Sequence, residues 1–257
     1  MDIDIIYNED CLSGMQRLPD RSIDMICCDL PYGVTGRRNE CAVWDNIIPF
    51  EPMWEQYERI IKPNGAIVLF AAGMFTHQLA MSNPKLFKYN LVWHKGNRIV
   101  GFLNANRCPL RCHEDILVFG IKQPKYNPQK WQGRPYKKAH SATSATPIYN
   151  CKKRVATENK DGMRYPLSII QIGMDNTEWQ DRIHKTQKPV ELIEYLIKTY
   201  SDEGDLILDN CMGSGTTAIA CMRTGRHFVG FEMNEQIYKD CMERVAKEPV
   251  RRNVELF

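Results

Sequence analysis

The feature of this chain that most constrains its fold is a glycine turn between an apolar strand and a helix. Leu206-Ile-Leu-Asp209 has the apolar character of a buried strand, and Gly213-Ser-Gly-Thr-Thr217 follows it. Residues 216–224 predict a helix that ends at Gly225, and residues 227–232 predict the next strand. A strand, a glycine turn, a helix and a second strand are typical of an α/β fold with a parallel sheet.

The glycine turn also has the spacing of a nucleotide-binding site. Gly213-x-Gly215-x-x-Ala218 between a strand and a helix matches the dinucleotide fingerprint. Glu232 closes the following strand, 17 residues after Gly215, where its carboxylate can accept both ribose hydroxyls. Nicotinamide, flavin and S-adenosylmethionine sites share this geometry, and a tight turn without a ligand is the plain alternative. The turn has no lysine, which argues against a nucleoside triphosphate.

The rest of the chain continues the alternation of strands and helices. Apolar patterns predict strands at 22–29, 66–71, 91–94 and 115–119 and helices at 51–61 and 235–246. Pro63-Asn-Gly65 predicts a turn before one of these strands. Pro189 is expected at the first position of another helix, where its missing N–H costs nothing. Residues 34–47 lack a clear period and are expected to form a mobile loop.

Length and charge divide the chain into a large α/β domain and an insert. We expect residues 1–120 and 181–257 to form the two parts of the domain, and residues 121–180 an inserted lobe. Within the lobe, residues 121–164 hold eleven Lys or Arg and two acidic residues, a net charge of +9, whereas the whole chain carries +3. Aromatic residues lie between these cations: Tyr126, Trp131, Tyr136, Tyr149 and Tyr165. This pattern favours a polyanion partner over a solvated linker.

Composition predicts the compartment and argues against a metal site. The chain has no run of 18 apolar residues and no signal peptide, which predicts a soluble, cytoplasmic protein without a membrane partner. None of the ten cysteines forms a Cys-x-x-Cys pair, and Cys108-x-x-x-Cys112-His113 lacks a matching second half. We therefore expect reduced, mostly buried thiols and no metal.

A second motif, Asp29-Leu30-Pro31-Tyr32, has the groups needed to hold an exocyclic amine of a nucleobase. The lone pair of such an amine is delocalised into the ring, so the nitrogen must become more tetrahedral before it attacks a methyl sulfonium. The Asp29 carboxylate and the Leu30 carbonyl can accept its two hydrogens. Tyr32 can stack on the base, and Pro31 stiffens the turn. A strand-end cap or a surface acid is the plain alternative for Asp29.

The two motifs and their order resemble the β group of DNA amino-methyltransferases, S-adenosylmethionine-dependent enzymes that methylate adenine N6 or cytosine N4. In that group a catalytic motif, Asp/Asn/Ser-Pro-Pro-Tyr/Phe, comes first, the target-recognition region follows, and the cofactor motif comes last. This chain has the same order: Asp29–Tyr32, the basic lobe, His184-Lys-Thr-Gln-Lys-Pro189, and Asp209–Thr217. The resemblance spans about residues 5–246 and implies a Rossmann-like class I methyltransferase sheet, mostly parallel, with helices on both faces.

The resemblance implies a role for each matching residue. The catalytic motif would hold the target amine: Asp29, Leu30, Pro31 and Tyr32. The methionine end of the cofactor would be lined by Asp209, Gly213, Ser214, Gly215 and Thr216. Around the rest of the cofactor, Glu232 would bind the ribose, Lys188 would close the carboxylate end, and Asp10 and Cys11 would lie beside the adenine. For Asp10 and Lys188 a plain surface charge is the alternative.

Three residues depart from the family pattern. Leu30 replaces the first proline of the catalytic motif, which keeps the carbonyl but implies a less rigid turn. Asn210 and Cys211 replace the Pro-Phe of the cofactor motif, which removes an apolar ring and predicts weaker cofactor binding.

The implied function is transfer of a methyl group from S-adenosylmethionine to N6 of an adenine flipped out of duplex DNA. In this family Asp at the first motif position favours adenine over cytosine, and N4-cytosine methylation is the alternative. The basic lobe would contact phosphates, and Arg37, Arg38 and Trp44 would close over the gap left by the base. The resemblance is compatible with a homodimer, and any restriction nuclease would be a separate polypeptide.

Other classes fit the chain less well. Cytosine C5 methylation uses a Pro-Cys pair, whereas Cys108-Pro109 has the reverse order. Methyltransferases of protein glutamine or RNA amines normally place the cofactor loop before the catalytic motif. A nicotinamide oxidoreductase leaves Asp29–Tyr32 and the basic lobe unexplained. A catalytically silent DNA-binding module on the same scaffold stays open because of Leu30 and Cys211.

Overall fold

The computed structural model describes residues 2–33, 45–138, 157–173 and 187–249. The chain divides into two compact units. The main unit comprises Met1–Asn127 and Ser168–Phe257, and the small unit comprises Pro128–Leu167. Arg37, Arg38, Trp44 and most of the loop expected at 34–47 lie outside the described residues.

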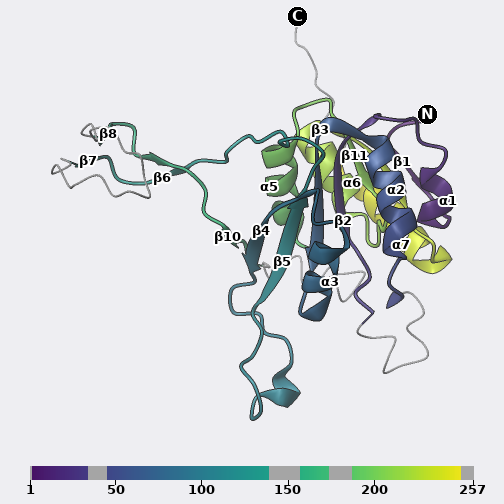
Figure 1. Cartoon of the computed structure of the whole chain (residues 1–257), viewed down its shortest axis with the longest axis horizontal. Coiled ribbons are helices and arrows are strands. Elements are labelled where there is room, and N and C mark those ends of the chain that lie inside the picture. The colour runs from purple at the N-terminus through teal and green to yellow at the C-terminus, as the bar shows by residue number, and fades with distance from the viewer. Residues whose placement is uncertain (1, 34–44, 139–156, 174–186, 250–257) are drawn as a thin grey trace, which may run out of the picture. The chain divides into compact units, whose positions relative to one another are not determined.

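An eight-stranded sheet forms the centre of the main unit (Figure 1). Its order is β1 (Ile5–Tyr7), β12 (His227–Phe231), β11 (Leu206–Asp209), β2 (Ile23–Asp29), β3 (Ile61–Ala71), β5 (His113–Phe119), β4 (Phe87–His94) and β10 (Ile169–Gln171). Every neighbouring pair is parallel except the two that β5 makes with β3 and β4. The predicted class, a mostly parallel α/β sheet, is therefore confirmed.

The central strand β2 shows why the sheet has helices on both faces. Met25 and Cys27 belong to one apolar cluster, whereas Ile26 and Cys28 belong to the other, and all four side chains are buried. Because alternate residues of a strand point to opposite faces, a continuous apolar run requires both faces to be covered.

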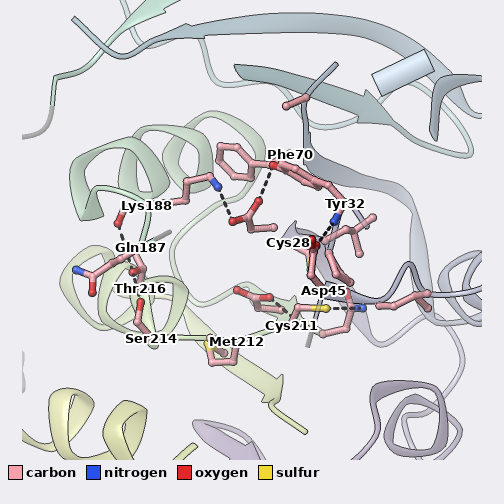
Figure 2. A pocket seen from close by; sticks show the side chains of 18 of the residues that line it. Cys28, Tyr32, Asp45, Phe70, Gln187, Lys188, Cys211, Met212, Ser214 and Thr216 are labelled. Atoms are coloured by element: carbon pink, nitrogen blue, oxygen red, sulfur yellow. Dashed lines mark hydrogen bonds and ion pairs between the residues drawn. The ribbon is translucent and has the colours of Figure 1, made fainter. Parts of the chain in front are cut away.

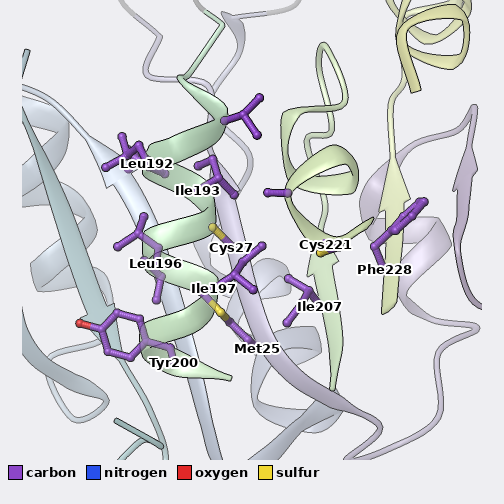
Figure 3. Packing of buried hydrophobic residues seen from close by; sticks show 14 of the residues in the cluster. Met25, Cys27, Leu192, Ile193, Leu196, Ile197, Tyr200, Ile207, Cys221 and Phe228 are labelled. Atoms are coloured by element: carbon purple, nitrogen blue, oxygen red, sulfur yellow. The ribbon is translucent and has the colours of Figure 1, made fainter. Parts of the chain in front are cut away.

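Two sets of helices supply this cover. On one face lie α5 (Val190–Tyr200), α6 (Thr216–Thr224) and α7 (Glu235–Lys247), whose residues join the cluster of Met25 and Cys27 (Figure 3). Against the other face lie α1 (Cys11–Met15), α2 (Phe50–Ile60) and α3 (Met74–Ser82). Within the described part of the chain, none of the helices combines the length and apolar character that crossing a membrane requires.

Two local predictions are corrected. Pro189 is the N-cap of α5, with φ −61° and ψ 137°, rather than its first helical residue, because its extended ψ precedes the helical turn that Val190 begins. Pro63-Asn-Gly65 was expected to form a turn before the strand at 66–71. These three residues instead lie inside β3, where the pairing register with β2 shifts. The irregular register absorbs the turn-forming residues without ending the strand.

Short elements were missed by the sequence analysis. β1, α1 and β10 contain three, five and three residues, too few to establish a period. α3 begins after Gly73, whose φ of 61° lies in the left-handed region that favours glycine.

The small unit is made of two short antiparallel ladders. β6 (Trp131–Gln132) pairs with β9 (Met163–Arg164), and β7 (Tyr136–Lys138) pairs with β8 (Thr157–Asn159). The Arg164 guanidinium lies 4.5 Å from the Tyr136 ring centroid and donates to Asn159 Oδ1 at 3.0 Å, which ties the ladders together. The small unit contains fewer residues than the lobe expected at 121–180, because β10, at Ile169–Gln171, pairs with β4 in the main sheet.

We predict that Leu196→Ala lowers the free energy of unfolding by about 2–5 kcal/mol, because the fully buried Leu196 side chain of α5 packs in the cluster beneath the sheet. Met81→Ala on α3 is the control, since the Met81 side chain is 73% exposed. Chemical denaturation of both variants measures the difference. Equal midpoints for the two variants would contradict this packing.

Candidate active site

The site lies where the connections of two neighbouring strands diverge. β11 continues through α6 to β12 on one side, whereas β2 continues through α2 to β3 on the other. In open α/β sheets such a switch point leaves a crevice outside the carboxyl ends of the strands. Asp29 is the last residue of β2 and Asp209 the last of β11.

A cavity of about 1380 Å³, here called the central cavity, occupies this crevice. The structure brings nearly all the predicted site residues to it, from both motifs. The lining includes Asp10, Cys11, Asp29, Leu30, Pro31, Tyr32, Lys188, Asp209, Gly213, Ser214, Thr216 and Glu232. Gly215 is the predicted residue that is not part of this lining.

Both carboxylate oxygens of Asp29 have partners (Figure 2). The Tyr32 hydroxyl donates to Oδ1 at 2.7 Å, and the Lys188 ammonium donates to Oδ2. The Asp29 side chain is 30% exposed, so it is also open to the cavity. Each carboxylate oxygen has a second lone pair, and Asp29 can therefore accept a further hydrogen bond without losing these two.

Lys188 belongs to a buried chain of alternating charges. Its side chain is 8% exposed, and its ammonium also lies 3.3 Å from Glu114 Oε2, while Lys95 pairs with the other Glu114 oxygen. Burial alone would lower the pKa of Lys188, but the two carboxylates outweigh it and raise that pKa above its usual value. Burial opposes ionisation of Glu114, yet Lys188 and Lys95 hold the Glu114 pKa below its usual value. The Lys188 ammonium thus contacts the catalytic motif, a partner that the sequence analysis did not predict.

Asp45 fixes the shape of the turn at Asp29–Gly33, here called the catalytic turn after the motif that it contains. Its Oδ1 accepts from the backbone N–H of Tyr32 at 2.9 Å and of Gly33 at 3.0 Å, and the residue is 4% exposed. Gly33 has a φ of 69°, and a Cβ there would lie 2.8 Å from Ile47. The sequence analysis placed Asp45 in the mobile loop expected at 34–47 and missed these contacts, because no local pattern indicates a partner twelve to thirteen positions away.

The catalytic turn is also anchored by apolar contacts. Leu30, which stands where the family pattern has proline, is buried in the cluster that contains α2. The Tyr32 ring stacks on Phe75 of α3, with centroids 5.2 Å apart and an interplanar angle of 28°. Burial of the Leu30 side chain therefore restrains the turn in place of a proline ring.

The two glycines of the cofactor motif have different tasks. Both have positive φ, 54° at Gly213 and 78° at Gly215. A Cβ on Gly215 would lie 2.8 Å from Cys241 and from Val245 of α7, so this glycine allows close helix packing. A Cβ on Gly213 would meet nothing closer than 3.8 Å, and this glycine leaves the backbone accessible from the cavity.

Arg244 of α7 organises the hydroxyl groups of the loop. Its guanidinium donates to the Ser214 carbonyl at 2.9 Å, to Ser214 Oγ at 3.3 Å and to Thr216 Oγ1 at 3.0 Å. Thr216 begins α6, a nine-residue helix whose first N–H groups therefore lie beside the cavity. Sequence reasoning missed Arg244 because it lies 28 residues beyond Thr216.

Glu232 connects the loop to the next helix. Its two oxygens accept from the backbone N–H of Gly213 at 3.0 Å and of Asn234 at 2.8 Å. The carboxylate is held at the end of β12, where it lines the cavity.

Asp209 shapes the loop from within. It is 4% exposed and accepts from Thr217 Oγ1 at 2.6 Å and from the Cys211 backbone N–H at 3.0 Å. Burial raises the pKa of Asp209 to about 6, although these hydrogen bonds oppose the shift. Its bonds tie the end of β11 to the first turn of α6.

The part of the cavity predicted to hold the adenine contains a helix N-cap residue, Asp10, and the thiols of Cys11 and Cys211. Asp10 is the N-cap of α1 and accepts from the Ser13 backbone N–H at 2.9 Å. Asn210 donates to the sulfurs of Cys11 and Cys211, each at 3.7 Å. Contact with Cys211 and burial raise the pKa of the Cys11 thiol, so it stays protonated at neutral pH.

The substitution of Asn210 for the family proline has a structural reason. The Tyr57 hydroxyl of α2 donates to Asn210 Oδ1 at 2.5 Å, and both residues are buried. The amide therefore joins the end of β11 to α2, an attachment that a proline side chain cannot make.

Comparison with known proteins identifies the family. A family model described as DNA methylase matches residues 23–243, from the start of β2 into α7. The chain belongs to this DNA methylase family. The resemblance to DNA amino-methyltransferases drawn from the two motifs is thereby confirmed.

The named relatives of this DNA methylase agree with the assignment. The type II methyltransferase M.BglII of Bacillus subtilis is 25% identical over 96% of this chain and 70% of its own length. The type II methyltransferase M.HindIII of Haemophilus influenzae is 23% identical over 96% of each chain.

Two solved structures share the fold. The M1.HpyAVI–SAM complex has a TM-score of 0.62 at 22% identity and covers 93% of this chain and 98% of its own. The cytosine-N4-specific PvuII DNA methyltransferase has a TM-score of 0.65 at 14% identity and covers 95% and 93%. The Rossmann-like class I methyltransferase fold expected from the resemblance is confirmed.

We predict that Asp209 makes stability fall with rising pH. The folded state binds the Asp209 proton more tightly than the unfolded chain does, so this contribution is full below about pH 4 and is lost as the pH rises through about 6. Asp209→Asn removes the titration and keeps the shape. Relative to this variant, the wild type should lose about 2–3 kcal/mol of unfolding free energy between pH 4 and pH 7. A pH-independent difference between the two proteins would contradict the raised pKa.

Proposed function

We propose that this DNA methylase transfers a methyl group from S-adenosylmethionine to N6 of an adenine flipped out of duplex DNA. The observation that carries the proposal is that the Asp29 turn and the glycine loop open onto one cavity. A base bound at the Asp29 turn and a cofactor bound at the glycine loop would place an amine next to a methyl donor in this cavity.

The cavity has the groups that an adenosyl and methionyl ligand requires. We propose that Gly213, Ser214 and Thr216 bind the methionine end, because Gly213 leaves the backbone accessible and the start of α6 favours a carboxylate. Glu232 would accept the ribose hydroxyls. The adenine would lie beside Asp10 and Cys11, with Asp209 and Gly215 supporting the loop from behind. M1.HpyAVI, a solved relative, is described as a SAM complex, which supports this choice of cofactor.

The proposed chemistry rests on Asp29. When bound, S-adenosylmethionine would supply an electrophilic methyl group: the amine nitrogen gains the methyl, the carbon–sulfur bond breaks with its electrons going to sulfur, and the nitrogen then releases one proton to water. Asp29 accepts one amine hydrogen and the Leu30 carbonyl the other, which favours the tetrahedral nitrogen that carries the developing positive charge. Pro31 and Tyr32 complete the turn that bears these acceptors.

Lys188 and Glu114 have a positioning role in this proposal. The ammonium fixes one Asp29 oxygen, and Tyr32 fixes the other, so the carboxylate orientation is set before the base arrives. Lys188 would thereby act on the amine end of the site rather than only at the cofactor carboxylate. The Lys188 ammonium lies between the carboxylates of Asp29 and Glu114, so Glu114 helps to keep Lys188 in place.

Adenine is proposed over cytosine because the first residue of the catalytic motif is Asp29. N4-cytosine methylation is the second candidate, since the PvuII enzyme with the same fold is described as cytosine-N4-specific. Mass spectrometry of nucleosides from DNA methylated by this protein separates the two: N6-methyladenine supports the first and N4-methylcytosine the second.

We further propose that residues 1–120 and 181–257 carry catalysis and cofactor binding, and that the lobe at 121–180 recognises DNA. The described cations and aromatic residues of the small unit support the lobe's role, for example Lys130, whose ammonium lies 4.6 Å from the Tyr165 ring centroid. Because its relatives are named type II methyltransferases, we propose that a cognate nuclease is a separate polypeptide. A homodimer is compatible with this arrangement.

Asp29→Ala should abolish methyl transfer to DNA, because the variant has no acceptor for the amine hydrogen at this position, while calorimetry shows S-adenosylmethionine binding within about threefold of wild type. Asp29→Asn keeps one carbonyl acceptor and should retain part of the activity. Asp240→Ala on α7, which does not line the cavity, is the matched control. Near-normal turnover by the alanine variant would refute the proposed role of Asp29.

Removing cations from the small unit should weaken DNA binding and its dependence on salt. The slope of log K against log salt becomes shallower by about 0.9 for each phosphate that the protein no longer neutralises. The variant Arg134→Gln/Lys137→Gln/Lys160→Gln changes three exposed cations, and Lys85→Gln in the main unit is the control. Fluorescence anisotropy with a mixed-sequence duplex measures both slopes. An unchanged slope in the triple variant would count against phosphate binding by this unit.

A further inference from the structure

The connection between β4 and β5 extends the sheet beyond its edge. Residues 95–112, here called the β4–β5 arm, continue the pairing of His94 with His113. The Lys95 N–H donates to the Cys112 carbonyl at 2.8 Å, and Val100 and Arg111 form a further antiparallel bridge. Because β4 runs in the same direction as β2, the arm leaves the same edge of the sheet as Asp29.

The tip of the arm is an ordered turn with apolar side chains facing solvent. Gly101, with a φ of 87°, leads into a 3-10 turn over Phe102–Asn104, and the Asn104 N–H donates to the Gly101 carbonyl at 2.8 Å. Phe102 is 69% exposed and Leu103 is 85% exposed. Ile99 and Val100 add half-exposed apolar surface next to them. Four exposed apolar side chains within residues 99–103, on a hydrogen-bonded turn, are typical of an interaction site.

The charge of the arm indicates the kind of partner. Residues 95–112 contain four cations and no acidic residue: Lys95, Arg98, Arg107 and Arg111. Lys95 is directed to Glu114 at the base of the arm. The cationic surface around the apolar tip favours an anionic partner that also offers flat apolar faces, and stacked bases between phosphates have both properties.

The position of the arm relates it to the site. Arg98, Ile99, Val100 and Arg111 line the central cavity together with Asp29 and Tyr32. These residues form part of the cavity wall, so a base that enters the cavity would lie close to the base of the arm.

We propose that the β4–β5 arm is a DNA wedge: Phe102 and Leu103 pack against the base faces exposed when the target leaves the stack, and Arg98, Arg107 and Arg111 contact the flanking phosphates. The inference rests on the proposed function. Unstacking a base exposes apolar surface on its neighbours, and apolar side chains inserted at the gap offset part of this cost. The wedge would accordingly act on base extrusion and leave cofactor binding unchanged.

The test compares two double variants of the tip. Phe102→Ser/Leu103→Ser removes the apolar surface, Phe102→Met/Leu103→Met keeps it, and Met81→Ser changes an exposed apolar residue of α3 outside the cavity. Transfer of tritiated methyl groups to unmethylated genomic DNA gives kcat/KM for each. We expect at least a tenfold loss for the serine variant and values within twofold of wild type for the other two. Calorimetric affinity for S-adenosylmethionine should stay within twofold in all of them, which excludes misfolding.

A second measurement isolates base extrusion. Once sequencing of the methylated DNA gives the target site, a duplex with an abasic site opposite the target base lowers the cost of flipping. The deficit of the serine variant should shrink below threefold on this duplex. Wild-type activity of the serine variant on intact DNA would refute the wedge, and so would a deficit that persists on the abasic duplex. Light scattering compares the oligomeric states: a dimeric wild type with a monomeric serine variant would also refute the wedge. An inactive wild type would instead refute the proposed function itself.

Discussion

The site depends on the parallel pairing of two central strands, β11 and β2. Ile207 pairs with Met25 and Leu208 with Ile26, although some 180 residues separate them along the chain. This register brings the carboxyl ends of the strands, Asp29 and Asp209, to one edge of the sheet. The connections then diverge to opposite sides, and the crevice between them is the central cavity. Without this pairing the catalytic turn and the glycine loop would not line the same cavity.

Around the cavity, polar groups are held by one another before any ligand binds. Asp29 is fixed by Tyr32 and Lys188, and Glu232 by two backbone N–H groups. Arg244 orders the hydroxyls of the loop in the same way. Groups oriented in advance need little reorganisation when charge develops on a substrate, and this preorganisation is a large part of enzymatic electrostatic stabilisation. The buried Lys188–Glu114–Lys95 chain extends the fixed network behind the catalytic turn.

Sequence reasoning predicted the central strands, the main helices and the residues of both motifs, because each is marked by a local period or by glycine, proline and acidic residues at strand ends. It missed contacts between distant segments, such as Asp45 on the catalytic turn and Arg244 on the loop, since no local pattern encodes them. The ion pair of Lys188 with Asp29 was missed for the same reason. Leu30 and Asn210 depart from the family pattern, and the structure explains them by the burial of Leu30 and by the hydrogen bond from Tyr57 to Asn210. The S-adenosylmethionine cofactor inferred from the motifs agrees with the ligand named in the M1.HpyAVI complex.

A crystal structure of this protein with S-adenosylmethionine would show whether the cofactor faces the catalytic turn across the cavity. We expect the methionine end at Gly213–Thr216, the ribose at Glu232, and the sulfonium methyl group directed across the cavity toward Asp29. A cofactor bound elsewhere, or one whose methyl group points away from the Asp29 turn, would contradict this arrangement.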